Sequence, residues 1–511
     1  MQEQKSASLT KIIGASSLGT MIEWYDFYIF GSLATVISTK FFPQDNPTAA
    51  FLSTLATFAA GFVVRPFGAL FFGRLGDLIG RKYTFMVTLL LMGGATFLIG
   101  CIPSYESIGF LAPILVLVLR LLQGLALGGE YGGAATYVAE HSPLNKRGFM
   151  TSWIQTTATI GLFVSLLVIM GTRSILSTEE FNDWGWRIPF WVSILLVILS
   201  YFIRKKMDES PVFLKAKAAG KTAKNPIKES FGKKQNFKFV LLALFGATMG
   251  QGVIWYTGQF YAMSFMEKTM NVDKEQVDSL LFIALICGTP FFIVFGWLSD
   301  KIGRKWIMMA GMLLAILAYR PIYESMYQTT NPKNKTEVLT KTQGTFVNKG
   351  QTNDSIYVNT KHYADGTIQT ATTKIKLSEG KPVVKNGKIQ SEIKISIHIN
   401  DHDKYWLIFL VFIQVIFVTM VYGPIAAFLV ELFPTKIRYT SMSLPYHIGN
   451  GVFGGLLPAV ATYLVTNAKD TGHPQWYLQG LWYPIGVASV CLFIGIIYIR
   501  STTKNLDEQH E

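Results

Sequence analysis

The chain has 511 residues, of which 50% are hydrophobic and only 15% are charged. Soluble domains usually carry about a quarter charged residues, so this balance excludes an ordinary soluble protein and indicates a membrane protein. The formal net charge of +14 does not indicate nucleic-acid binding, because the basic residues concentrate in loops between apolar runs, where they set membrane topology.

Apolar runs long enough to cross a bilayer as helices, about 20 residues each, recur along nearly the whole chain. They lack the alternation of barrel strands, so we predict an all-α membrane protein with twelve transmembrane helices. The first run contains acidic residues, unlike a cleavable signal peptide, and we expect it to remain as the first span. The spans are expected near 11–38, 50–73, 83–102, 110–138, 149–172, 187–204, 238–266, 278–299, 306–326, 404–431, 441–466 and 479–500.

Short loops rich in Lys and Arg alternate with loops that are poor in them. Because Lys and Arg are enriched in cytoplasmic loops, this alternation predicts that both termini are cytoplasmic. Residues 204–238 hold eleven Lys or Arg against three Asp or Glu. We interpret 205–237 as a cytoplasmic linker between a six-helix bundle, 1–204, and a second bundle formed by 238–328 and 404–511, which ends in a short tail. Such a basic segment is also compatible with binding to anionic lipid headgroups.

The stretch 329–403 interrupts this pattern between the ninth and tenth spans. It is polar and rich in Lys, Thr and Asn, and it falls on the extracytoplasmic side. Isoleucines that alternate with polar residues over 393–399, and an Asn386-Gly387 turn between apolar flanks, are strand and hairpin signals. We therefore predict a small antiparallel β unit here, and a passive insertion is the simplest interpretation of its role.

One loop motif occurs twice, at Gly73–Lys82 and at Gly296–Lys305, each time after the second span of its half. Such a repeat indicates internal pseudo-symmetry, as expected of transporters built from repeats. Its glycines allow a tight turn, its Asp can meet a helix amino end, and its Arg can meet a carboxylate or a helix carboxyl end. We predict that these groups latch one conformation and separate in the other. The expected gating residues are Gly73, Arg74, Asp77, Gly80, Arg81, Lys82, Glu130, Asp300, Gly303, Arg304 and Lys305.

The first copy of this motif resembles the signature of the major facilitator superfamily between spans two and three. Further segments look like the metabolite:proton symporter branch, which includes carriers of proline/betaine, 2-oxoglutarate, citrate and shikimate. These segments are Ile22–Phe27, Arg65–Gly68, Arg120–Gly124, Gly128–Gly133, Gly185–Phe190, Glu209–Pro211 and Glu431–Arg438. The resemblance covers most of the chain outside 329–403. It implies two pseudo-symmetric six-helix bundles in a bacterial inner membrane, and transport rather than enzymatic activity.

A few ionisable residues lie within the predicted spans, where charge is costly unless it faces a cavity or a partner. Glu23 and Asp26 lie three residues apart in the first span and are expected to share a helix face. In related facilitators a first-span acid and a fourth-span Arg are associated with coupling, so the resemblance implies that Asp26 and Arg120 take part in proton coupling. Asp26 would take up the proton, and Glu23 would share this role. A permanent ion pair that only aids folding is the alternative. Arg65 would bind a substrate carboxylate, or extend its charge toward the membrane surface.

The second half offers polar and aromatic groups rather than charges in its spans. Aromatic rings that stack on a cation, flanked by amide groups, suit a zwitterion or a hydroxylated acid. Gln251, Trp255 and Gln259 recur every four residues and are expected to form one face, and His447 is a hydrogen-bonding group or a second proton carrier. The expected substrate-binding residues are Arg65, Arg120, Gln123, Gln251, Trp255, Tyr256, Gln259, Tyr422, Tyr446, His447 and Asn450.

These features predict a secondary active transporter, a proton-coupled symporter of a carboxylate or a zwitterionic osmolyte such as betaine or proline. No nucleotide loop, metal site or redox site is visible, so we expect no cofactor and a proton gradient as the energy source. The expected partners are a small-molecule substrate, protons and the lipid bilayer, without nucleic acid, and we expect a monomer. The alternatives are a membrane sensor that uses the insertion to bind a ligand, and a facilitator for sugars or drugs.

Overall fold

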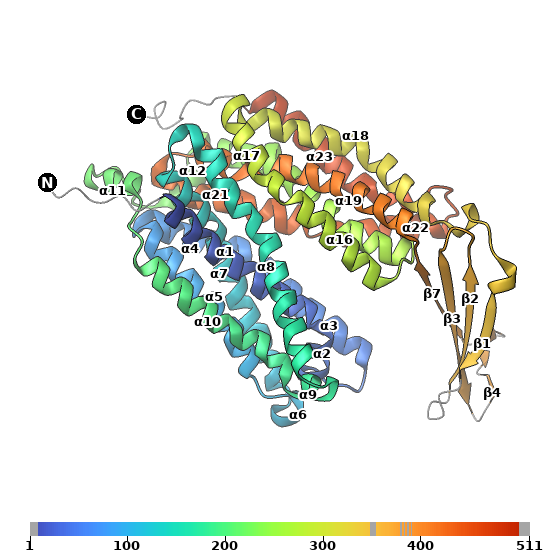
Figure 1. Cartoon of the computed structure of the whole chain (residues 1–511). Coiled ribbons are helices and arrows are strands. Elements are labelled where there is room, and N and C mark those ends of the chain that lie inside the picture. The colour runs from blue at the N-terminus through green and yellow to red at the C-terminus, as the bar shows by residue number, and fades with distance from the viewer. Residues whose placement is uncertain are drawn as a thin grey trace.

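The long apolar runs form helices that gather into two bundles, and a β-sheet projects from one end of the second bundle (Figure 1). The computed structural model describes residues 9–347, 354–378, 381–382, 384–385, 388–389 and 391–499.

The amino-terminal half contains the helices that precede the basic linker. They are α1 (Leu9–Ser32), α2 (Ala34–Phe41), α3 (Pro47–Val63), α4 (Arg65–Leu78), α5 (Arg81–Cys101), α6 (Tyr105–Ile108), α7 (Leu111–His141), α8 (Arg147–Ile175), α9 (Thr178–Asp183) and α10 (Ile188–Lys205). The second predicted span is broken into α3 and α4, because Pro66 lacks a backbone N–H and is tolerated in the first turn of a helix. A Cβ on Gly124 of α7 would lie 2.2 Å from the Gly61 carbonyl oxygen, and one on Gly128 would lie 2.2 Å from that of Arg65. The glycine stripe of α7 therefore serves close helix packing.

The carboxy-terminal half follows two short linker helices. The helices from the linker onward are α11 (Pro211–Ala218), α12 (Pro226–Gly232), α13 (Lys234–Ala243), α14 (Met249–Tyr256), α15 (Ala262–Ser264), α16 (Lys274–Gly288), α17 (Pro290–Ile302), α18 (Arg304–Thr330), α19 (Asp401–Tyr422), α20 (Ile425–Leu432), α21 (Arg438–Ile448), α22 (Leu457–Asp470) and α23 (Trp482–Tyr498). π-Helical turns at Leu244–Thr248 and Thr257–Tyr261 connect α13, α14 and α15 into one span, which ends in a third π turn at Phe265–Thr269. Another π turn, at Gly449–Gly454, follows α21. Because a π turn widens the helix, it changes which side chains share a face.

Within the described residues, eleven helical segments are long and apolar enough to cross a membrane, one fewer than predicted. The expected first span, α1, is not among them. Polar side chains in its middle, including Glu23 and Asp26, lower its hydropathy. It nevertheless packs against α7, α8 and α10 inside the amino-terminal half.

The strands lie within 343–398, between α18 and α19. They are β1 (Gln343–Val347), β2 (Asp354–His362), β3 (Ile368–Ser378), β4 (Lys381–Pro382), β5 (Val384–Lys385), β6 (Lys388–Ile389) and β7 (Ser391–His398). β1, β2, β3 and β7 pair antiparallel in this order, β4 pairs with the end of β3, and β5 pairs with β6. The predicted Asn386-Gly387 turn lies outside the described residues.

The sheet is fastened to the second half at two places. The Ile397 N–H donates to the Asn271 carbonyl at 2.7 Å, and the Asp273 N–H donates to the Ile397 carbonyl at 2.9 Å. Lys335 forms ion pairs with Asp365 and with Asp403, the latter at 2.6 Å. Burial lowers the pKa of Lys335, but its hydrogen bonds to the two carboxylates outweigh burial and raise that pKa above its usual value. The anchor therefore stays charged at neutral pH.

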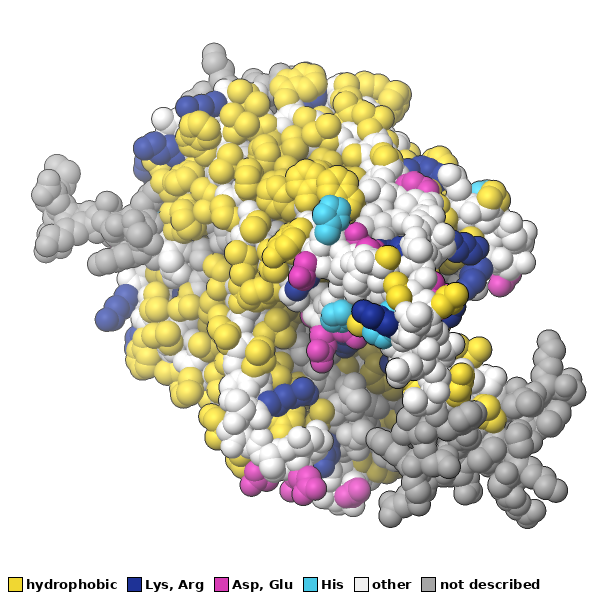
Figure 2. All heavy atoms as spheres, turned by 45° about the vertical axis from the view of Figure 1, so that its right-hand side comes forward, with side chains coloured by type: hydrophobic (Ala, Val, Ile, Leu, Met, Phe, Trp, Pro, Cys, Tyr) yellow, Lys and Arg dark blue, Asp and Glu magenta, His cyan; other side chains and the backbone are white. Residues whose placement is uncertain are grey.

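The two halves meet at the end that carries α11 and α12 and diverge toward the end that carries the sheet (Figure 1). We call these the linker end and the sheet end. Helices α4, α7 and α8 pack against α17, α20 and α21 where the halves meet. Hydrophobic side chains cover much of the bundle exterior, whereas polar and charged side chains dominate the sheet (Figure 2). This surface suits bundles that lie in lipid and a sheet that lies in water.

Candidate functional site

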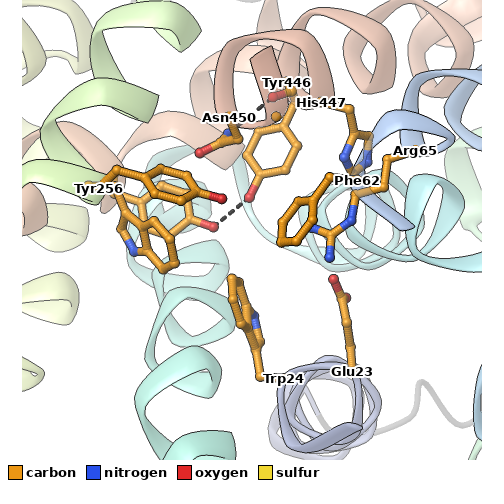
Figure 3. A pocket seen from close by; sticks show the side chains of 11 residues that line it. Glu23, Trp24, Phe62, Arg65, Tyr256, Tyr446, His447 and Asn450 are labelled. Atoms are coloured by element: carbon orange, nitrogen blue, oxygen red, sulfur yellow. Dashed lines mark hydrogen bonds between the residues drawn. The ribbon is translucent and has the colours of Figure 1, made fainter. Parts of the chain in front are cut away.

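A pocket lies between the two halves (Figure 3). Its lining residues are Glu23 and Trp24 of α1, Phe62 of α3, Arg65 of α4, Trp255 and Tyr256 of α14, Tyr422 of α19, Tyr446 and His447 of α21, and Asn450 and Gly451 of the following π turn. The structure thus brings together residues that lie more than 400 positions apart in the sequence. Three of these lining residues were not among the predicted site residues: Trp24, Phe62 and Gly451.

Charged and polar atoms without a partner face this pocket. The Glu23 carboxylate points toward the Arg65 guanidinium (Figure 3), and the two described side chains form no ion pair. Glu23 Oε2, Arg65 Nε, Trp255 Nε1 and His447 Nε2 are buried and have no hydrogen-bond partner among the described protein atoms. Buried polar atoms in native proteins are nearly always hydrogen-bonded, so four such atoms in one pocket indicate a site for a polar ligand.

Aromatic rings form the walls of the pocket. The Arg65 guanidinium lies over the Phe62 ring, 4.2 Å from its centroid, which orients the charge. The rings of Trp24 and Trp255 approach one another from opposite halves, with centroids 5.4 Å apart. The Tyr446 hydroxyl forms a hydrogen bond of 2.5 Å with the Tyr422 hydroxyl. These contacts give the pocket an apolar surround with a few polar groups.

Asp26 lies in a second polar cluster beside the pocket. It accepts a hydrogen bond of 2.8 Å from the Thr96 hydroxyl of α5. The Thr96 oxygen accepts one of 2.6 Å from the Gln123 amide, and the Gln123 carbonyl oxygen accepts one of 2.8 Å from Arg120. Arg120 also lies over the Phe30 ring, 4.3 Å from its centroid. The described structure therefore joins Asp26 to Arg120 through two intervening side chains and not by a direct ion pair.

We expected Glu23 and Asp26 to share a helix face, but the two side chains reach different sites. Residues three apart on a helix differ by about 60° in direction, and here Glu23 lines the pocket while Asp26 points to α5. Gln251 and Gln259 do not line the pocket either. Gln251 exchanges hydrogen bonds of 3.1 and 3.0 Å with Asn450. Gln259 lies in the π turn after α14, which breaks the expected four-residue periodicity.

The first copy of the repeated motif joins the halves at the linker end. The Asp77 carboxylate accepts hydrogen bonds from the backbone N–H groups of Tyr439 and Thr440, at 3.3 and 2.9 Å, and from the Thr440 hydroxyl at 2.8 Å. These groups form the first turn of α21, where a negative charge is favourable. Arg81 pairs with Asp77 at 3.2 Å and donates to the Thr435 carbonyl in the other half at 2.8 Å.

The second copy repeats this arrangement with the halves exchanged. The Asp300 carboxylate accepts hydrogen bonds of 2.8 Å from the backbone N–H groups of Gly148 and Phe149, in the first turn of α8. Arg304 pairs with Asp300 at 2.6 Å and with Glu431 at 3.1 Å. Each motif thus caps a helix of the opposite half, and the two caps are related by the pseudo-symmetry of the fold.

The other motif residues have supporting positions. Gly80 and Gly303 have φ angles of +130° and +98°, which favour glycine, and each precedes the first residue of a helix. A Cβ on Gly73 would lie 2.8 Å from Thr440 Cα, so this glycine lets α4 approach α21. Lys82 and Lys305 donate to main-chain carbonyls within their own halves, at 3.1 and 2.7 Å. Arg74 is exposed.

We expected Glu130 to be a gating residue, but it does not join the two halves. It pairs with Arg204 of α10 at 2.5 Å and accepts a hydrogen bond of 2.7 Å from Thr88 of α5. Both partners belong to the amino-terminal half. Glu130 therefore holds α7 to its neighbours inside one bundle.

Two ion pairs between the halves were missed from the sequence. Arg438 pairs with Glu140 at 2.9 Å, and Arg147 lies 3.9 Å from Glu431. A repeat offers the signal that would have found them, because Glu-x-x-Pro-x-x-x-Arg occurs at 140–147 and again at 431–438. Thr96 was missed as well, since a hydroxyl in an apolar span has no distinctive pattern.

Comparison with known proteins agrees with this arrangement. The family model described as "Sugar (and other) transporter" matches residues 11–241. The chain is 31% identical over 473 residues to the "Inner membrane metabolite transport protein YhjE" of Escherichia coli, which covers 90% of this chain and 89% of that protein. It is 30% identical to the proline/betaine transporter of Salmonella typhimurium, covering 92% and 81% of the two chains. It is 28% identical to the citrate-proton symporter of Salmonella typhi, covering 90% and 88%.

A solved structure has the same fold. It is the major facilitator superfamily proton:xylose symporter XylE bound to 6-bromo-6-deoxy-D-glucose, with a TM-score of 0.66 at 15% identity. The alignment covers 98% of both chains. At this identity the likeness concerns the fold alone.

Proposed function

The chain belongs to the major facilitator superfamily, in its metabolite:proton symporter branch, and on that premise we propose that it couples uptake of a small polar metabolite to proton entry. The proposed cargo is a carboxylate or a zwitterion such as betaine or proline. The two halves would rock about the pocket, so that it opens to one side of the membrane at a time.

The four unpartnered polar atoms of the pocket carry this proposal. Arg65 and Trp255 offer N–H donors to a ligand carboxylate, whereas Glu23 offers an anionic acceptor to a ligand cation. The surrounding aromatic rings suit an ammonium or quaternary ammonium group. A sugar or a hydrophobic drug has no carboxylate to accept the N–H groups of Arg65, which disfavours those two alternatives.

Asp26 is the proposed proton carrier. It is 3% exposed, it lies outside the pocket lining, and it is linked to the positive charge of Arg120 by hydrogen bonds. Proton uptake at this position would remove a buried negative charge without displacing the cargo. The name of the citrate-proton symporter among the relatives agrees with such coupling. The proton gradient is the proposed energy source, without a cofactor.

We further propose that α1 is the twelfth span, that the linker end faces the cytoplasm of a bacterium, and that both termini lie there. The basic residues of the linker support this orientation, because Lys and Arg are retained on the cytoplasmic side. In this orientation the latches at Asp77 and Asp300 close the cytoplasmic side, and the pocket faces the sheet end. The protein is proposed to act as a monomer in the inner membrane.

Thermal stabilisation of the purified protein tests the cargo class. Glycine betaine, proline, mono-, di- and tricarboxylates, and sugars are each added at two pH values. A ligand at 100 times its Kd stabilises the folded state by about 2.7 kcal/mol and raises the melting temperature. We expect a pH-dependent rise with a carboxylate or a zwitterion. Stabilisation by sugars or hydrophobic cations alone would overturn the proposal.

A further inference from the structure

Thr96 occupies the middle of the hydrogen-bonded chain between Arg120 and Asp26. Arg120 has only donors, so the Gln123 carbonyl oxygen must face it, and the Gln123 amide N–H must face Thr96. Thr96 Oγ1 therefore accepts from Gln123, and its single proton is free for another acceptor. Two acceptors are within reach, Asp26 Oδ2 at 2.8 Å and the Met92 carbonyl oxygen at 3.0 Å.

A hydroxyl with one proton can donate to only one of these acceptors at a time. When Asp26 is charged it can only accept, and Thr96 donates to it. When Asp26 carries a proton on Oδ2, the carboxyl group donates to Thr96, and the Thr96 hydroxyl turns to the Met92 carbonyl. The Thr96 hydroxyl and Asp26 Oδ2 keep a partner in both arrangements, so the Thr96 hydroxyl loses no hydrogen bond without forming another.

We propose that Thr96 is a positioning residue whose hydroxyl reports the protonation of Asp26 to Gln123 and Arg120. The inference rests on the proposed function, because it assigns a role in proton coupling. The proton arrives from water at Asp26 Oδ2, and only the direction of the Thr96 O–H bond changes. Through the same chain, the Arg120 charge polarises the amide that in turn polarises Thr96.

Among the described residues, few other titratable or charged groups interact with Asp26. Glu23 and Tyr25 are on the same helix and Arg120 is on α7, while α5 contributes the uncharged Thr96. The helices α8 and α10, which also pack against α1, carry their Arg residues at their ends: Arg147 and Arg173 on α8, and Arg204 on α10. In the described structure, hydrogen bonds through Thr96 and Gln123 thus connect Asp26 to the charge of Arg120.

Infrared titration of the purified full-length protein tests the inference without knowledge of the cargo. The C=O stretch of a protonated carboxyl group is followed against pH, and the Asp26 band is identified by its loss in Asp26→Asn. Thr96→Val keeps the shape and removes the hydroxyl, so we expect the midpoint of this band to move by about one pH unit to higher pH, because a hydrogen bond to a charged group is lost. Thr96→Ser should restore the original midpoint.

Two further variants separate this role from a structural one. Thr84→Val, on the same helix, removes a buried hydroxyl that donates to the Gly80 carbonyl alone, and it should leave the band unchanged. Gln123→Met breaks the chain at its other joint and should move the midpoint in the same direction. The double variant Thr96→Val/Gln123→Met should then move it no further than Thr96→Val alone, because both act on one chain.

The outcomes distinguish the inference from the proposed function. If Asp26 shows no titrating band in the unaltered protein, the proton carrier is misassigned and both fail. If the band titrates but Thr96→Val and Gln123→Met leave its midpoint and frequency unchanged, only the role of Thr96 is overturned. Should Thr96→Val fail to fold, Gln123→Met and Thr96→Ser decide the matter by the same criteria.

Discussion

Tyr131 of α7 and Tyr446 of α21 stack across the boundary between the halves, with ring centroids 3.7 Å apart and planes 5° apart. Tyr446 also lines the pocket, and Tyr131 accepts a hydrogen bond of 2.8 Å from Gln155. Tyr131 lies eleven residues beyond Arg120, about 16 Å nearer the linker end along the helix. The stacked pair therefore closes the pocket toward the linker end, and the halves cannot separate there without parting the two rings.

Tyr131→Ala should shift the protein toward the state that is open at the linker end. An aromatic pair contributes about 0.5–1.5 kcal/mol, so the open population should rise by up to about tenfold. Spin labels at Arg74 and Lys301, which are exposed in the second spans of opposite halves, report the opening by pulsed electron resonance in a background without the native cysteines. Tyr131→Phe keeps the ring and should keep the closed distance. An unchanged distance distribution in Tyr131→Ala would show that the pair is not a gate.

Asp77→Asn and Asp300→Asn should each loosen one helix cap and spare the other. Asn keeps an acceptor oxygen but removes the negative charge, and loss of that charge at a helix amino end weakens the first turn by about 0.3–1 kcal/mol. Amide hydrogen exchange should therefore accelerate at Tyr439 and Thr440 in Asp77→Asn, and at Gly148 and Phe149 in Asp300→Asn.

Each of these two variants is the control for the other. Exchange that accelerates equally at both caps in either variant would mean that the latches open together rather than as independent contacts.

Arg65→Lys should weaken binding of the carboxylate or zwitterion found by thermal stabilisation, by at least about tenfold. Lys keeps the charge but lacks the planar fork that pairs with a carboxylate and stacks on the Phe62 ring. The matched control is Arg74→Lys, an exposed residue of the same helix. The Kd of each variant is measured by melting-temperature titration with the compound. Equal Kd values for the two variants would show that Arg65 does not bind the compound.

The insertion should be dispensable for uptake. None of the pocket-lining residues lies between Thr330 and Asp401, so replacement of 331–400 by a short Gly-Ser linker should keep uptake within about threefold once folding is verified by its melting temperature. A membrane sensor that binds its ligand through the sheet predicts the opposite. Loss of ligand binding in a folded variant would favour that alternative.

The architecture could be predicted because hydropathy and charge act locally. Apolar length marks the spans, and the repeated motif marks the two halves. Eleven described helices, and not the predicted twelve, are apolar enough to cross a membrane, and α1 is the one that is not. The residues that give this helix its proposed function, Glu23 and Asp26, also make it less apolar. Function and hydropathy conflict at that position.

The site was only partly predictable for a different reason. Unusual residue types in apolar spans, such as Arg65 and His447, identified much of the pocket lining. Sequence spacing assumed regular α-helix, so it could not anticipate the π turn that carries Gln259 away from the pocket. Nor could it find Thr96, whose importance comes from two partners on other helices.

The most direct test of the central account is transport by Asp26→Asn in liposomes with an imposed proton gradient, using the compound that stabilises the unaltered protein. The account predicts that the unaltered protein accumulates this compound against its concentration gradient. Asp26→Asn should lose this accumulation, because the neutral side chain carries no proton, and yet retain exchange of labelled for unlabelled compound. Undiminished gradient-driven accumulation in Asp26→Asn would contradict the account.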